Sequence, residues 1–108
     1  MAGFAKTKKE IKEMPEGNRK EAATALVREA EFIAGELKKL RADLELEGWI
    51  ETYQNGENQK GIKKSSKGEV YVQLCKQLVS VVKGMTDIMP GSSTGESELA
   101  QFMKGLAR

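Results

Sequence analysis

The stretch LVREAEFIAGELKKLRADL, residues 26–44, decides the fold. Its apolar residues recur at spacings of 4, 3, 4, 3 and 4, the heptad spacing that gathers side chains on one face of a helix. The positions of this seam are Leu26, Ala30, Ile33, Leu37, Leu40 and Leu44. Ala, Glu and Lys, which favour helix, fill the other faces. The pattern predicts a helix over about 16–47 that ends near Gly48.

The start of this helix has two candidate signals. Pro15 suits a first helical turn, because the N–H that it lacks would have no intrahelical partner there. Asn18 is the alternative, as an N-cap followed three residues later by Glu21 in a variant of the capping box. Beyond the other end of the helix, we expect Trp49 and Ile50 to fold back as an apolar plug.

A second seam with the same period predicts a second helix over about 67–89, closed by Pro90–Gly91. Ser66 is its candidate N-cap. The seam positions are Tyr71, Leu74, Leu78, Val81, Met85 and Ile88. Val70, Val79 and Val82 widen the apolar surface, which indicates more than one partner helix. The two helices are expected to pack antiparallel as a helical hairpin.

The connector WIETYQNGENQKGIKKSS contains the turn dipeptide Asn55-Gly56, and the WIETY before it alternates like a short strand. A β-hairpin would need a matching apolar run after the turn, where the sequence offers only Ile62. We therefore expect an ordered, flexible Lys- and Gly-rich loop over 49–66.

The two ends of the chain are predicted to be short. Residues 1–14 form a basic arm or short helix, with Phe4, Ile11 and Met14 inward. Residues 91–108 comprise the linker GSSTG and a helix. The apolar stripe of this helix is Leu99, Phe102, Met103 and Leu106. The stripe either closes the protein's own bundle or docks a larger partner, and both readings stay open.

The expected fold class is all-α, in a single domain of 108 residues. A long antiparallel, coiled-coil-like hairpin over 15–90 lies between the short terminal helices. So small a core with such wide apolar faces predicts self-association.

Composition excludes several kinds of chemistry. The chain has no histidine, which removes His triads, His-ligated zinc and imidazole acid–base catalysis. A single cysteine excludes an internal disulfide and a Cys-cluster metal site, and fits a reducing compartment. No apolar run reaches the roughly 18 residues that span a bilayer, and the first residues lack the apolar region of a secretory signal. We expect a cytoplasmic, non-enzymatic protein with no cofactor, no metal and no membrane contact.

Two groups of reactive side chains are better explained by structure than by catalysis. Glu36, Asp43, Glu47 and Glu51 lie at near-helical spacing, but nearby lysines and arginine favour a solvated helix face over a metal site. Cys75 adjoins the second seam and has no histidine partner, so we expect a small packed side chain.

The lysines are the candidate DNA contacts, because mobile lysines beside glycines can follow a phosphate backbone without reading bases. Four lie in the connector region and four in the N-terminal arm. These candidates are Lys60, Lys63, Lys64 and Lys67, with Lys6, Lys8, Lys9 and Lys12. Ordinary solubilising charge is the alternative, and the net charge of +2 does not choose between them. Trp49 and Tyr53 could stack on bases, although packing is the commoner role.

An ordered series of features also carries a resemblance. A Lys-rich start and a Pro-Glu opening precede a long helix that ends in Glu-Gly; a Tyr-Gln-Asn-Gly turn and a Lys-Lys-Ser approach follow. The second helix, YVQLCKQLVSVVKGMTDIMP, has a leading Tyr and a closing Met-Pro. From Pro15 to Pro90, about two-thirds of the chain, this order resembles the small terminase subunits of tailed bacteriophages that infect Gram-positive hosts.

The resemblance implies a role and partners. Small terminase subunits assemble into rings, recognise the packaging start site on viral DNA and regulate the large subunit, which carries the ATPase and nuclease. It therefore implies a DNA-packaging factor in the host bacterial cytoplasm. The implied partners are further copies of the chain, in a ring or another oligomer, double-stranded DNA and the large terminase subunit.

One departure limits the resemblance. Many members open with a helix-turn-helix domain, for which residues 1–14 are too short, so DNA contact would use the lysines of the arm and loop or the inner surface of a ring. A helical adaptor or inhibitor that binds only protein is the alternative. The salt dependence of DNA binding distinguishes the two.

Overall fold

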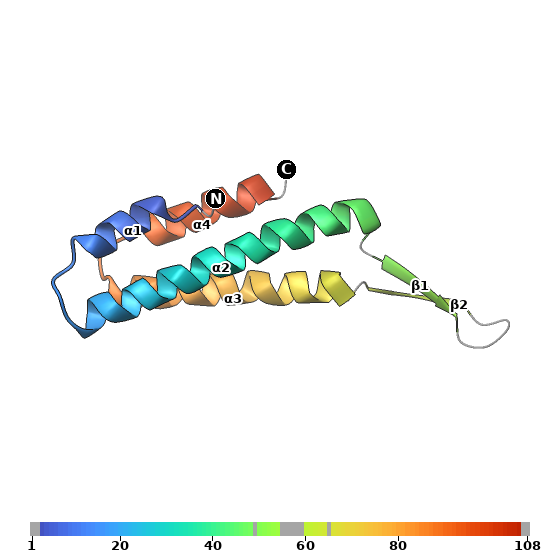
Figure 1. The fold of residues 1–108 in the computed structure, drawn as a ribbon, viewed down its shortest axis with the longest axis horizontal. Coiled ribbons are helices and arrows are strands. Elements are labelled where there is room, and N and C mark those ends of the chain that lie inside the picture. The colour runs from blue at the N-terminus through green and yellow to red at the C-terminus, as the bar shows by residue number, and fades with distance from the viewer. Residues whose placement is uncertain (1–2, 49, 55–59, 65, 107–108) are drawn as a thin grey trace.

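The computed structural model describes residues 3–48, 50–54, 60–64 and 66–106, with side chains for 3–48 and 66–106. The elements in chain order are α1 (Ala5–Lys12), α2 (Asn18–Glu47), β1 (Ile50–Gln54), β2 (Lys60–Lys64), α3 (Ser66–Ile88) and α4 (Thr94–Leu106). The fold is all-α in class, with four helices in the described ranges (Figure 1).

The two long helices α2 and α3 run antiparallel and pack along their lengths, which confirms the predicted helical hairpin (Figure 1). The predicted seams meet between them: Leu37 and Leu78 are fully buried, and Met85 is 1% exposed. The other seam positions are buried or pack against this core from its edge. Heptad spacing on both helices therefore produced one shared core within a single chain.

Glycines mark both ends of α2. Gly17, in the N-cap position, has φ 144°, and Gly48, in the C-cap position, has φ 89°. Backbone of this kind favours glycine, because a side chain would clash there. The Gly48 amide donates to the carbonyl of Leu44 at 2.8 Å, which satisfies one of the last carbonyls of the helix. Neither predicted start holds: Pro15 precedes the helix, and Asn18 is its first residue rather than its cap.

The connector corrects an expectation. Residues 50–54 and 60–64 form a two-stranded antiparallel β-ribbon where a loop was expected. Ile50 pairs with Lys64 and Gln54 with Lys60. The expectation of a loop was wrong because α2 and α3 are antiparallel and already bring the starts of the two strands together. The strands can therefore pair without a second apolar run. The register sets position 51 opposite position 63. The predicted plug residue Trp49 lies outside the described residues.

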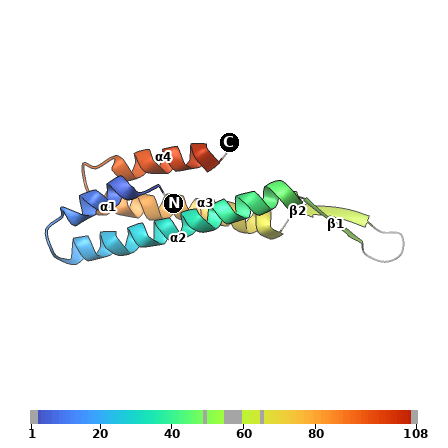
Figure 2. The same ribbon diagram turned by 45° about the horizontal axis from the view of Figure 1, so that its top comes forward.

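The short helices α1 and α4 cover the half of the helical pair that lies away from the ribbon (Figures 1 and 2). Phe4 is fully buried and Ile11 is 3% exposed, with Met14 packed at the edge of the core, as predicted. Phe102 and Leu106 of α4 join the same core. The molecule is elongated, at 65 × 25 × 18 Å. Its radius of gyration of 17.8 Å compares with about 13 Å for a compact domain of this length.

The two short helices are joined by reciprocal hydrogen bonds, in which each helix supplies one carboxylate to the other; we call this pair of contacts the carboxylate exchange. Glu98 of α4 accepts hydrogen bonds from the amides of Lys6 and Thr7 at 3.1 and 2.8 Å, and from the Thr7 hydroxyl at 2.5 Å. In return, Glu10 of α1 accepts from the hydroxyls of Ser92 and Thr94, where α4 begins. Each helix therefore supplies a carboxylate to the start of the other, where the helix dipole favours negative charge. Glu98 binds free amides of α1, whereas Glu10 binds hydroxyls at the start of α4.

Replacing Glu98 by Gln tests this exchange. The carboxylate is 7% exposed and serves three donors, so the neutral amide weakens charge-assisted hydrogen bonds in a buried setting. We expect the free energy of unfolding in urea to fall by about 1–3 kcal/mol. The exposed Glu29→Gln on α2 is the control and should change stability by less than about 0.5 kcal/mol. Equal stabilities for the two variants would show that the exchange contributes nothing.

Candidate functional site

The predicted DNA-contact lysines fall into two groups that the fold keeps apart. The arm lysines lie on α1, beside the half of α2 that is far from the ribbon (Figure 1). Lys60, Lys63 and Lys64 all belong to β2, and Lys67 stands in the first turn of α3. The two clusters therefore lie toward opposite ends of a molecule 65 Å long, and do not form one continuous surface.

The ribbon projects beyond the ends of α2 and α3 (Figures 1 and 2). Strands of five residues are about 17 Å long. Because successive residues of a strand alternate between faces, positions 60 and 64 share one face of the ribbon and position 63 lies on the other. Both faces of this projecting element therefore carry lysine positions. A two-stranded ribbon is one of the two protein elements that the DNA major groove admits.

Lys67 differs from the other connector lysines. Its ammonium lies 2.9 and 3.1 Å from the carboxylate oxygens of Glu47, and 3.5 Å from Asp43. The hydrogen bond with Glu47 raises the pKa of Lys67, against an opposing effect of burial. Its charge therefore already serves to join the end of α2 to the start of α3, at the base of the ribbon.

The arm lysines are exposed on α1. Lys8 forms an ion pair with Glu31 of α2 at 3.2 Å. Lys6, Lys9 and Lys12 form no ion pair within the described residues. Three charges on a short helix offer a second, smaller place for phosphate contact.

The predicted docking stripe divides into two halves. Phe102 and Leu106 are 8% and 9% exposed and belong to the core, and the ammonium of Lys38 lies 6.0 Å from the centre of the Phe102 ring. Leu99 and Met103 are only half-buried. The helix thus packs on its own chain, and Leu99 and Met103 supply the apolar surface that it presents to solvent.

The other reactive side chains have structural roles. Glu36 pairs with Lys39 at 3.3 Å, while the side chain of Glu51 lies outside the described part. Among the described residues, no three His, Cys, Asp or Glu side chains gather as a possible metal site. Burial raises the pKa of the Cys75 thiol, which lowers the fraction of reactive thiolate.

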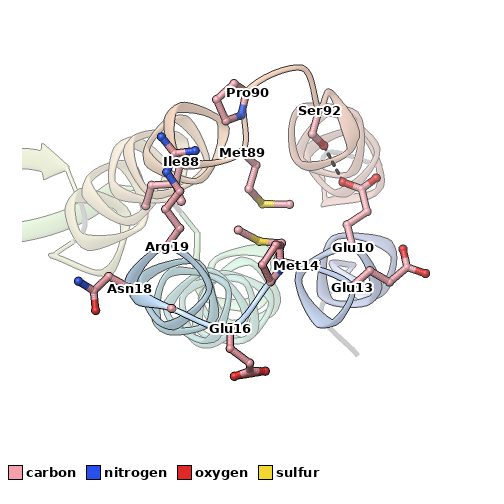
Figure 3. A pocket seen from close by; sticks show the side chains of 12 residues that line it. Glu10, Glu13, Met14, Glu16, Asn18, Arg19, Ile88, Met89, Pro90 and Ser92 are labelled. Atoms are coloured by element: carbon pink, nitrogen blue, oxygen red, sulfur yellow. Dashed lines mark hydrogen bonds between the residues drawn. The ribbon is translucent and has the colours of Figure 1, made fainter.

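The structure also contains a pocket of about 700 Å³ at the end of the bundle. The sequence analysis did not predict this pocket. Figure 3 shows Met14 and Met89 between the helices, beside Pro90, with Glu10 and Glu13 on the rim. Pro15 follows Met14 and Pro90 follows Met89, and each proline interrupts the helical pattern. These two Met-Pro pairs are the sequence feature that could have indicated the pocket. The lining is mainly apolar and holds no paired nucleophile and base, so it could receive an apolar side chain but has no evident chemistry of its own.

No protein-family profile matches the sequence, and no curated protein or solved structure matches it either. None of the described helices combines the length and apolar character that crossing a membrane requires.

The pocket-rim residue Glu10 predicts a dependence of stability on pH. Hydrogen bonds from Ser92 and then Thr94 lower its pKa from the ordinary 4.5, against an opposing effect of burial. A carboxyl whose pKa is lower in the folded state stabilises the fold above its unfolded pKa, and this contribution is lost as pH falls through the folded pKa. We expect Glu10→Gln to reduce the loss of thermal stability that the parent shows on acidification below about pH 4.5. Parallel curves for parent and variant from pH 6 to about pH 3 would refute this role for Glu10.

Proposed function

We propose that the chain is a non-catalytic DNA-packaging factor of the kind that phage small terminase subunits represent. It binds viral double-stranded DNA as an oligomer and regulates the large subunit that carries the ATPase and nuclease. The observation that carries the DNA-binding part is the β-ribbon, with lysines at 60, 63 and 64, that projects beyond the helical body (Figure 1).

The geometry of the ribbon supports contact with duplex DNA. An element that protrudes from the body approaches a duplex without obstruction by the helices. A two-stranded ribbon fits the major groove, which is about 12 Å wide, while lysines bind the phosphates that border it. Lysine supplies a flexible point charge rather than a fixed fork of donors, so contacts of this kind favour phosphate over particular bases. The proposal is therefore sequence-tolerant binding by the ribbon.

Shape supports the oligomer. A compact protein of 11.9 kDa exposes roughly 6,000 Å² of surface, whereas this chain exposes 7412 Å². The excess of this single chain is larger than the roughly 800 Å² that one partner contributes to a standard protein–protein interface. The seam residues, which are buried within one chain, do not provide this interface, so it must use other surfaces. Regulation of a large subunit rests on the resemblance of residues 15–90 alone.

The triple variant Lys60→Gln, Lys63→Gln and Lys64→Gln tests the ribbon. We expect weaker binding to duplexes of any sequence, and a salt slope that flattens by up to about 3 units per bound subunit. The matched control replaces three exposed helix lysines, Lys39, Lys76 and Lys104, by Gln and should keep the parent slope. Fluorescence anisotropy over a salt series measures both. If the triple variant and the control behave alike, the ribbon is not the DNA contact; a parent that binds no duplex would favour the protein-only adaptor.

A further inference from the structure

A cleft of about 360 Å³ separates α1 from the first half of α2, on the half of the molecule away from the ribbon (Figure 1). Ile11 of α1 and Val27 of α2 line its floor, and each is 3% exposed. Lys8 and Lys12 of α1 and Arg28 of α2 line its walls. The cleft shares no lining residue with the bundle-end pocket. It therefore combines a small apolar floor with basic walls.

Two contacts hold α1 in an antiparallel course against this part of α2. The Lys8 ammonium lies 3.2 Å from a carboxylate oxygen of Glu31, and the Lys20 ammonium donates to the carbonyl of Lys12 at 3.2 Å. Arg28 lies between Lys20 and Glu31 along α2, so it borders the same stretch of α1. The carboxylate exchange also fixes the start of α1. The helices that carry the basic side chains are therefore in place before any partner arrives, which lowers the entropic cost of binding.

The basic walls carry more positive charge than the cleft neutralises. Lys8 is paired with Glu31, the acidic residue among the described residues that line the cleft. Lys12 and Arg28 are exposed, and neither forms an ion pair with any residue whose side chain the structure describes. Cations from two different helices are therefore available to a partner, on either side of an apolar floor.

We infer that this cleft is a docking site for an acidic segment of a protein partner. An aliphatic side chain of the segment enters the cleft above Ile11 and Val27, and its flanking carboxylates pair with Lys12 and Arg28. The guanidinium of Arg28 binds a carboxylate through two parallel hydrogen bonds, whereas Lys12 supplies a point charge. The occupant follows from charge complementarity, since basic residues around an apolar centre match a segment that carries the opposite charge around an apolar side chain.

The same features favour a peptide over a nucleic acid. A duplex presents one phosphate charge per about 1.7 Å of its axis, and its backbone has no aliphatic side chain to place on an apolar floor. Glu31 on the wall would repel such a dense row of phosphates, whereas a peptide places its fewer carboxylates beside the cations alone. The inference goes beyond the proposed function, because it concerns a protein contact on the helical body and does not depend on DNA binding by the ribbon.

Selection from a random peptide library displayed on phage tests the site with the intact protein. The library is first depleted on the Arg28→Glu variant and then selected on the parent, so that the remaining binders depend on Arg28. We expect the selected peptides to combine acidic residues with an aliphatic one. In fluorescence anisotropy, a selected peptide should bind at least about tenfold more weakly to Lys12→Gln and to Arg28→Gln. Lys76→Gln, at an exposed position of α3 that does not line the cleft, is the control and should bind like the parent.

Replacements in the peptide supply the matching test. Changing its acidic residues to amides, or its aliphatic residue to serine, should in each case weaken binding at least about tenfold. Thermal unfolding of the protein variants should match that of the parent, because the replaced side chains are exposed.

A depleted library that yields no acidic peptides, or binding that survives either replacement in the peptide, would overturn the inference. So would a duplex that displaces the peptide and itself binds about tenfold more weakly to Arg28→Gln, because the cleft would then be a phosphate contact. Duplex binding by the same samples separates this inference from the proposed function. A parent that binds the selected peptide but no duplex would remove the proposed function and leave the cleft. A parent that binds duplex through the ribbon, while no acidic peptide is selected, would remove the cleft alone.

Discussion

Packing of the α2 seam against the α3 seam is the interaction on which the rest of the structure depends. Leu37, Leu44 and Leu78 are at most 1% exposed, and a fully buried side chain of this size contributes about 1.5–3 kcal/mol. No other pair of the helices and strands that the structure describes packs over a comparable length. The seam also fixes the course of the chain: two helices that end side by side deliver residues 50 and 64 to each other, and the ribbon follows from that meeting.

The chain closes on itself through polar contacts rather than through a larger core. Glu98 and Glu10 lie more than 80 residues from the donors that they bind, and each stabilises the start of a short helix that would be marginal alone. These contacts hold α1 and α4 in place, with Phe4 and Phe102 buried in the core. The same half of the molecule therefore combines α1, α4 and the bundle-end pocket. The opposite end presents the lysine positions of the ribbon.

The sequence predicted the parts of the fold that depend on local periodicity. Heptad spacing located α2 and α3, and Gly48 marked where α2 ends. Pairing of Tyr53 with Gly61 was missed because β2 has no apolar alternation and so gives no local signal for a strand. The ribbon is stabilised by the helices that hold its two strands together. The carboxylate exchange was equally invisible, since Glu98 and Thr7 are far apart in sequence. Among the candidate lysines whose side chains the structure describes, the ion pairs of Lys8 and Lys67 distinguish members that otherwise look alike in sequence.

The central claim is that duplex DNA meets this protein at the β-ribbon and not on the helical body. Backbone amide shifts followed by NMR during titration with a short duplex test it most directly, because they report every described segment at once. We expect shift changes concentrated at residues 50–54 and 60–64, at the far end from α1. Changes centred on Lys6, Lys9 and Lys12, with the ribbon amides unmoved, would contradict it.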